Sequence, residues 1–145
     1  METDAQTLHI ALRKRYPNAE VFVLDDKYEL PTKEVYQRYL KRFRKWLRAL
    51  KLANWVRNIR DCDKFAHWFK GYVGVSHATG DDDNALPVGF ICYLIGGDKD
   101  KGHAINNAVY AHGKGLEIGE IEPQDASGTF SLTKKERESV WLVVV

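Results

Sequence analysis

The chain has 145 residues and a formal net charge of +2, with 44% hydrophobic and 29% charged residues. These values are typical of one globular domain, which we expect to span residues 1–145, and they exclude an intrinsically disordered chain. The apolar runs near residues 86–95 and 140–145 are too short to cross a bilayer.

The first half of the chain predicts helices. In chain order, we expect a helix over residues 5–16, a strand over 21–24, a long helix after Thr32, a helical segment over 52–60 and a new helix after Asp61. The long helix has apolar residues in steps of three and four, which is the spacing of an amphipathic helix. Residues 71–84 contain Gly and Asp and predict a polar loop.

The second half predicts strands separated by Gly-rich turns. We expect them over residues 88–95, 103–110, 116–122 and 140–145. Helices followed by a run of strands indicate an α+β fold with N-terminal helices packed on an antiparallel sheet.

The basic residues are concentrated in one segment. Residues 33–60 carry ten Lys or Arg and one acid, a net charge of +9, which leaves −7 for the rest of the chain. We expect this basic face to be solvated or paired with acids of the same chain, and to attract polyanions only weakly. Because the aromatic residues share the buried stripe, we expect no specific nucleic-acid binding and no membrane partner.

A thiol, an imidazole and a carboxylate occur in an order that suggests a nucleophilic site. Cys62 is placed in the first turn of a predicted helix, where the backbone N–H groups and the helix dipole favour a thiolate. His103 begins a predicted strand and Glu122 ends the next one, so the two side chains can meet across the hairpin. Cys92 lies in an apolar run and is expected in the core.

Three motifs at these positions resemble a known family. They are Asp61-Cys62-Asp63-Lys64-Phe65-Ala66, Gly102-His103-Ala104-Ile105-Asn106 and Ile121-Glu122-Pro123-Gln124. Together they resemble the papain-like C-terminal domain of the Marasmius oreades agglutinin and its small phage-encoded relatives. The resemblance implies a papain-like fold with Cys62 as nucleophile, His103 as base and Glu122 as the residue that orients the base.

The same resemblance implies a calcium-activated peptidase, and one residue departs from it. The family pattern has two acids after the cysteine, whereas here Asp63 is followed by Lys64. Asp63 is the candidate metal ligand, but an ammonium beside it repels a cation. We therefore expect no required cofactor, and calcium dependence is disfavoured.

Two site positions stay open on the sequence. Gln124 is two residues after Glu122, so in an extended strand both side chains point to the same face. Gln124 therefore competes with Glu122 for the role of orienting His103. Asn106 either faces the site or bonds to a turn.

Two functions follow from these residues. The first is a papain-like cysteine hydrolase, a peptidase or amidase with a peptide or protein substrate, encoded by a phage and acting in the host cytoplasm. The alternative is a catalytically inactive papain-like binding protein that binds or inhibits a host factor. The first residues show no signal-peptide pattern, so either protein is expected in the cytoplasm with reduced cysteines.

Overall fold

The protein is built around one large sheet. A computed structural model describes residues 1–59, 61–80, 84–125 and 128–145 and contains a six-stranded and a two-stranded sheet. The large sheet has the spatial order β2 (Glu20–Phe22), β8 (Leu142–Val144), β4 (Val88–Leu94), β5 (Gly102–His112), β6 (Gly115–Ile121), β7 (Thr129–Phe130). The small sheet pairs β1 (Glu2–Asp4) with β3 (Lys27–Glu29).

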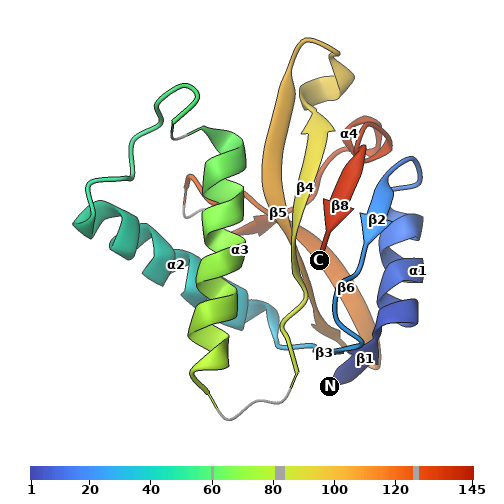
Figure 1. Cartoon of the computed structure of the whole chain (residues 1–145). Coiled ribbons are helices and arrows are strands. Elements are labelled where there is room, and N and C mark those ends of the chain that lie inside the picture. The colour runs from blue at the N-terminus through green and yellow to red at the C-terminus, as the bar shows by residue number, and fades with distance from the viewer. Residues whose placement is uncertain (60, 81–83, 126–127) are drawn as a thin grey trace.

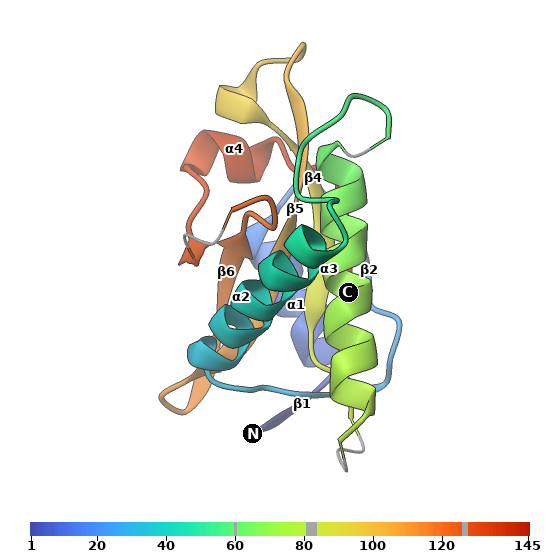
Figure 2. The same cartoon turned by 90° about the vertical axis from the view of Figure 1, so that its left-hand side faces the viewer.

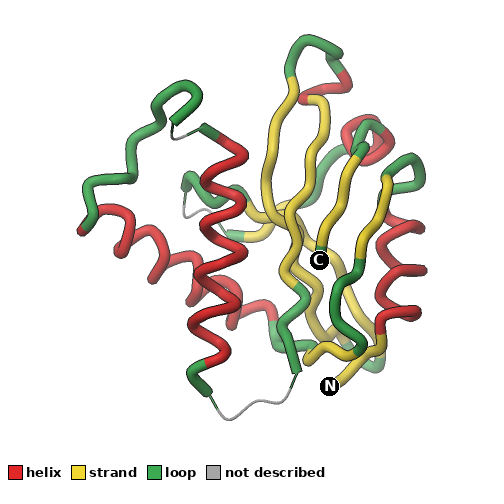
Figure 3. Tube along the Cα trace, viewed as in Figure 1, coloured by secondary structure: helices red, strands yellow, loops and turns green. Residues whose placement is uncertain are grey.

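Helices lie on both faces of the large sheet (Figure 1). They are α1 (Ala5–Arg15), α2 (Lys33–Ala49), α3 (Cys62–Ala78) and the short α4 (Lys134–Glu138), with one further 3-10 turn at Ile95–Gly97. The two long helices α2 and α3 lie on one side of the sheet and α1 lies on the other, and the helices flank the strands (Figure 3). This arrangement is an α+β fold, as the sequence predicts.

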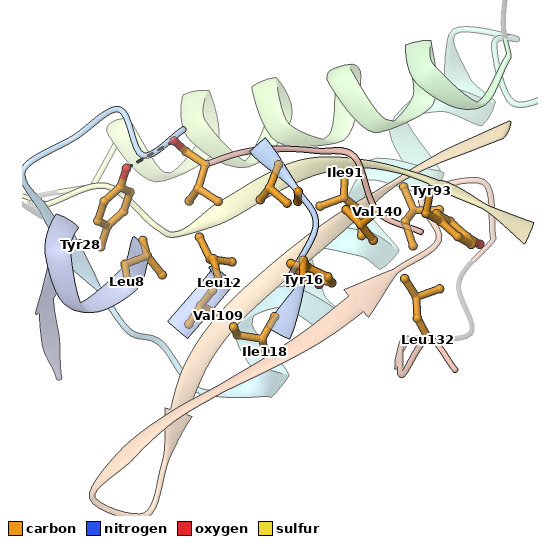
Figure 4. Packing of buried hydrophobic residues seen from close by; sticks show 14 of the residues in the cluster. Leu8, Leu12, Tyr16, Tyr28, Ile91, Tyr93, Val109, Ile118, Leu132 and Val140 are labelled. Atoms are coloured by element: carbon orange, nitrogen blue, oxygen red, sulfur yellow. Dashed lines mark hydrogen bonds between the residues drawn. The ribbon is translucent and has the colours of Figure 1, made fainter. Parts of the chain in front are cut away.

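Alternate residues of β5 enter two different cores. Ile105 and Val109 pack with Leu8 and Leu12 of α1, and Figure 4 shows part of this cluster. Ala108 and Tyr110, on the opposite face, pack with residues of α2 and α3. The period of two along a strand therefore divides the apolar side chains between the two helical layers.

The predicted antiparallel sheet is in fact mixed. Neighbouring strands run antiparallel from β8 to β7, but β2 pairs with β8 in the parallel direction, with Val21 opposite Val143. The strand from the beginning of the chain thus lies beside the strand from its end. A pairing of such high sequence separation leaves no turn signal between the two strands.

The helix at Cys62 is longer than its sequence suggests. We expected a loop from residue 71 onward, but α3 continues to Ala78, and residues 81–83 of that loop lie outside the described residues. Phe65, Phe69 and Val73 are buried at steps of four, which supplies the packing that extends the helix.

Other predicted elements are confirmed or corrected at their ends. The helices over 5–16 and after Thr32 and the strands over 88–95, 103–110 and 116–122 are all present. The helical segment over 52–60 is wrong for the part that is described: residues 52–59 contain no helix, and Asn58 has a positive φ angle of 62°, which a right-handed helix does not admit. Within the described residues, no helix has the length and apolar content needed to span a membrane.

Candidate functional site

Cys62 is the first residue of α3. The preceding Asp61 has extended backbone angles and acts as the N-cap, and its Oδ2 atom accepts a hydrogen bond of 3.1 Å from the backbone N–H of Asn58. Lys64 Nζ lies 3.4 Å from Asp61 Oδ1 and 2.7 Å from Asp63 Oδ2. These contacts hold the helix end, so the partly buried thiol is presented at a fixed position where the helix dipole favours a negative charge.

The edge of β5 beside Cys62 is not paired with β6. The ladder between β5 and β6 begins at Asn106 opposite Ile121, so it leaves residues 102–105 of β5 without a partner from β6. The backbone N–H of Ala104 lies on this edge and forms a hydrogen bond with the Cys62 thiol. The end of β6 at Ile121 therefore leaves this edge of β5 available to the Cys62 thiol.

His103 and Glu122 meet at the same edge. Nε2 of His103 lies 2.7 Å from Oε2 of Glu122, and the two side chains are 18% and 19% exposed. Since Nε2 is used by Glu122, Nδ1 is the ring nitrogen that remains for the hydrogen bond between His103 and Cys62. The structure thus brings Cys62, His103 and Glu122 together in one hydrogen-bonded cluster.

Gln124 supports this cluster through Glu122. Its backbone N–H and its Nε2 atom donate to Oε1 of Glu122 at 3.1 and 3.3 Å. One carboxylate oxygen of Glu122 therefore faces the imidazole and the other is held by Gln124. Glu122 is the residue that contacts His103, and Gln124 contacts Glu122.

The hydrogen bonds change the protonation of the pair. The hydrogen bond with His103 lowers the pKa of Cys62 against the opposing effect of burial, and backbone N–H groups act in the same direction. Burial works against the charged form of His103, but hydrogen bonds with Cys62 and Glu122 outweigh it and raise the pKa of His103 to about 9. Both shifts favour a thiolate beside an imidazolium.

The side chains of two other predicted residues form different contacts. Asn106 is fully buried, and its Nδ2 atom donates to the carbonyl oxygens of Ala66 and Gly89, both at 2.9 Å. It therefore ties α3 to β4. Asp63 forms the ion pair with Lys64, and among the described residues no group of three His, Cys, Asp or Glu side chains is placed to hold a metal ion.

Sequence reasoning missed two neighbours of the cluster. The ring of Tyr93 packs edge-on against His103 with centroids 5.7 Å apart, and Ala104 supplies a backbone donor. Tyr93 is directly opposite His103 in the β4–β5 register. The register of these two strands would therefore have predicted the contact.

Comparisons with known proteins identify structures of similar fold. The PSL1a–E64 complex matches with a TM-score of 0.77 and 20% identity over 99% of this chain and 50% of that chain. The Polyporus squamosus lectin bound to the human-type influenza-binding epitope Neu5Aca2-6Galb1-4GlcNAc matches with a TM-score of 0.75 and 20% identity over 99% of this chain and 49% of that one. This chain therefore spans about half the length of these structures. No family model and no curated protein matches the chain.

These matches correct the predicted function. At 20% identity they establish a fold shared with a fungal lectin structure, and they do not confirm the predicted relation to the Marasmius oreades agglutinin domain. A lectin is a binding protein, so the finding contradicts the predicted function as a cysteine hydrolase with a catalytic triad.

Proposed function

We propose that this protein is a binding protein that holds its ligand covalently through Cys62. The observation that carries the proposal is the hydrogen-bonded cluster of Cys62, His103 and Glu122 at the first turn of α3. A structural cysteine needs no imidazole partner, and a lowered thiol pKa is typical of cysteines that react with electrophiles.

The proposal includes a papain-like scaffold in a single domain of residues 1–145, related to the agglutinin domain that the sequence resembles. Its support is that three motifs distant in sequence meet at one place. Cys62 begins a helix, His103 lies on the adjacent strand, and Glu122 follows the next strand of the same sheet. This is the combination of elements that the resemblance implies.

The bonding step follows from the protonation of the pair. The Cys62 thiolate attacks an electrophilic carbon of the ligand, and the bond from that carbon to an oxygen opens. The imidazolium of His103 gives its proton to this oxygen, while Glu122 keeps the ring oriented and stabilises its charge before transfer. The ligand then remains attached to the sulfur, so each protein molecule binds one ligand.

The ligand is a molecule with an electrophilic carbon, either a small compound or a group on a host protein. One of the structures of similar fold is a complex with E64, so this compound is the probe for the proposal. We propose that no metal ion is needed for this step. The ammonium of Lys64 lies 3.4 Å from Asp61 and 2.7 Å from Asp63, so it would repel a metal ion at these carboxylates.

The test is the mass of the intact protein after incubation with E64. We expect one adduct on the wild type, located at Cys62 by peptide mapping, and no adduct on Cys62→Ala. Cys92→Ala is the matched control, because it removes the other cysteine and should leave the adduct unchanged.

A second measurement separates binding from hydrolysis. The wild-type protein should not repeatedly cleave any peptide of a fluorogenic library. Repeated cleavage that disappears in Cys62→Ala would overturn the proposal, and so would an E64 adduct that persists in Cys62→Ala.

A further inference from the structure

The outer side of α2 carries a continuous row of positive charge. Its members are all exposed and follow one another at helical steps of three, one, three and three: Arg38, Lys41, Arg42, Lys45 and Arg48. At a rise of about 1.5 Å per residue, the row extends about 15 Å along the helix. Figure 2 shows α2 crossing in front of the sheet, with its outer side turned away from the strands.

Within the part of the chain that the structure describes, these cations have little compensation from acids, although Glu34 attracts Arg38. Glu34 is the only acidic residue in the sequence from 33 to 60. Among the described residues, no ion pair joins an acid to any of the five cations of this row. The sequence left open whether these cations are solvated or paired with acids of the same chain. Among the described residues they are solvated, so the row attracts anions.

Aromatic side chains lie directly beside this row, which the sequence did not predict. Trp46 was expected in the buried stripe, but it is 41% exposed. Its ring is held against Phe43 and Tyr72, with centroids 5.9 and 5.7 Å apart. Trp46 is thus a fixed apolar surface one helical turn from Arg42.

A small hollow continues the same side of the helix. It has a volume of about 260 Å³ and is lined by Val35, Arg38, Tyr39 and Arg42. Val35, Tyr39, Arg42 and Trp46 follow at steps of four, three and four, so they form one line along α2. Arg42 therefore lies between the rings of Tyr39 and Trp46 along this line, where Tyr39 is half-buried and Trp46 is exposed.

We propose that this face of α2 binds single-stranded nucleic acid without sequence preference. The five cations contact successive backbone phosphates, and Trp46 offers its ring to a base. An acidic peptide would use the cations but has no use for an exposed aromatic surface, whereas every base has a face that stacks. The side chains of this face offer cations and rings rather than a pattern that reads base edges, so affinity depends on charge and stacking.

The experiment is a fluorescence-anisotropy titration of the full chain with a short fluorescein-labelled oligothymidylate at several salt concentrations. Five phosphate contacts predict a slope of log affinity against log salt of about −3.5. Arg42→Gln and Lys45→Gln should each reduce the slope by about 0.7, since each removes one contact. Trp46→Ala should weaken binding on the order of tenfold and leave the slope unchanged.

Matched variants keep the result interpretable. Lys134→Gln removes an exposed cation on α4, and it should bind as the wild type does. If Trp46→Ala is unfolded by circular dichroism, Trp46→Phe replaces it and should retain most of the affinity. The proposal is overturned if the wild type does not bind at low salt, or if Lys134→Gln changes the slope as much as Arg42→Gln. It is also overturned if polyglutamate competes as well as the oligonucleotide while Trp46→Ala has no effect, which would assign the face to an acidic protein.

Discussion

Nε2 of His103 lies 2.7 Å from Oε2 of Glu122, although the residues are 19 positions apart in the chain. Glu122 follows the last residue of β6, just where that strand leaves its neighbour β5. The end of the strand pairing therefore lets the carboxylate turn toward the imidazole. The same opening exposes the β5 edge to Cys62.

The rate of Cys62 alkylation should depend on pH as the lowered pKa of this thiol requires. Only the thiolate reacts, so the rate rises as pH increases through a midpoint below the ordinary thiol value of 9.0 and then levels off. A second change is expected near pH 9, where His103, whose pKa is raised to about 9, loses its proton. Iodoacetamide kinetics on the native protein, with a urea-denatured control, measure both midpoints. Identical native and denatured profiles would contradict the prediction.

Cys92 should react much more slowly than Cys62 at neutral pH. Burial raises the pKa of Cys92 to about 11, so a smaller fraction of this thiol is ionised. One equivalent of iodoacetamide should modify Cys62 alone, as peptide mapping will show. Modification of Cys92 first, or at a similar rate, would mean that the site does not activate its cysteine.

Replacing Glu122 by Gln should lower the reactivity of Cys62 more than replacing Gln124 by Ala. The amide keeps the shape but removes the negative charge beside His103, so the pKa of His103 falls and that of Cys62 rises. A change of about one pKa unit would slow alkylation near neutral pH roughly tenfold. Gln124→Ala removes only the 3.3 Å side-chain contact and keeps the backbone one. An NMR titration of the His103 ring in both variants measures the cause directly, and the reverse order of effects would contradict this role.

Calcium should not alter the reactivity of Cys62, and chelators should not reduce it. Lys64 supplies the positive charge between Asp61 and Asp63. In Lys64→Glu this charge is replaced by a third carboxylate, so a calcium-dependent change in alkylation rate and in thermal stability is expected there. A wild-type rate that falls on addition of chelator would show that the ammonium does not fill this role.

Glu120 should be among the residues most important for stability, away from the cysteine. It is fully buried and accepts hydrogen bonds from Arg15 at 2.9 to 3.1 Å, from the Tyr16 hydroxyl at 2.8 Å and from the backbone N–H of Leu132 at 3.1 Å. Glu120→Ala leaves these donors without their acceptor, and urea denaturation should show a loss of about 3–5 kcal/mol.

The matched control for this loss is Glu138→Ala. Glu138 pairs with Lys134 at 3.7 Å on the surface, and such exposed pairs contribute about 0–1 kcal/mol. Equal losses of unfolding free energy in Glu120→Ala and Glu138→Ala would mean that the buried network contributes no more to stability than the exposed ion pair.

Local sequence patterns were sufficient for most helices and strands. The steps of three and four in α2 and the turn residues between β4, β5 and β6 predicted these elements because their signals lie within a few residues. The continuation of α3 past Gly71 was missed because it depends on burial of Phe69 and Val73 against other elements. The local sequence does not indicate which of its residues pack against other elements.

Cys62, His103 and Glu122 were selected as candidates from the sequence, because their residue types and motifs suggest a reactive thiol. Their distances were not available there. They depend on the end of the β5–β6 pairing and on the packing of α3 over β5, both of which are long-range contacts. The sequence also could not decide whether Glu122 or Gln124 orients His103. Both side chains would lie on the same face of an extended strand, and which of them reaches His103 depends on where the strand ends and the chain turns.

The sequence by itself determined the α+β class, the amphipathic long helix and the chemistry available at Cys62, because these follow from residue type and local spacing. Only the tertiary structure decided that β2 joins the sheet beside β8, that Asn106 ties α3 to β4, and that Trp46 is exposed beside the basic row. Each of these depends on which surfaces meet when distant segments pack. The hydrophobic effect is non-directional. The sequence pattern therefore predicts which side chains are buried, but not which helix or strand packs against them.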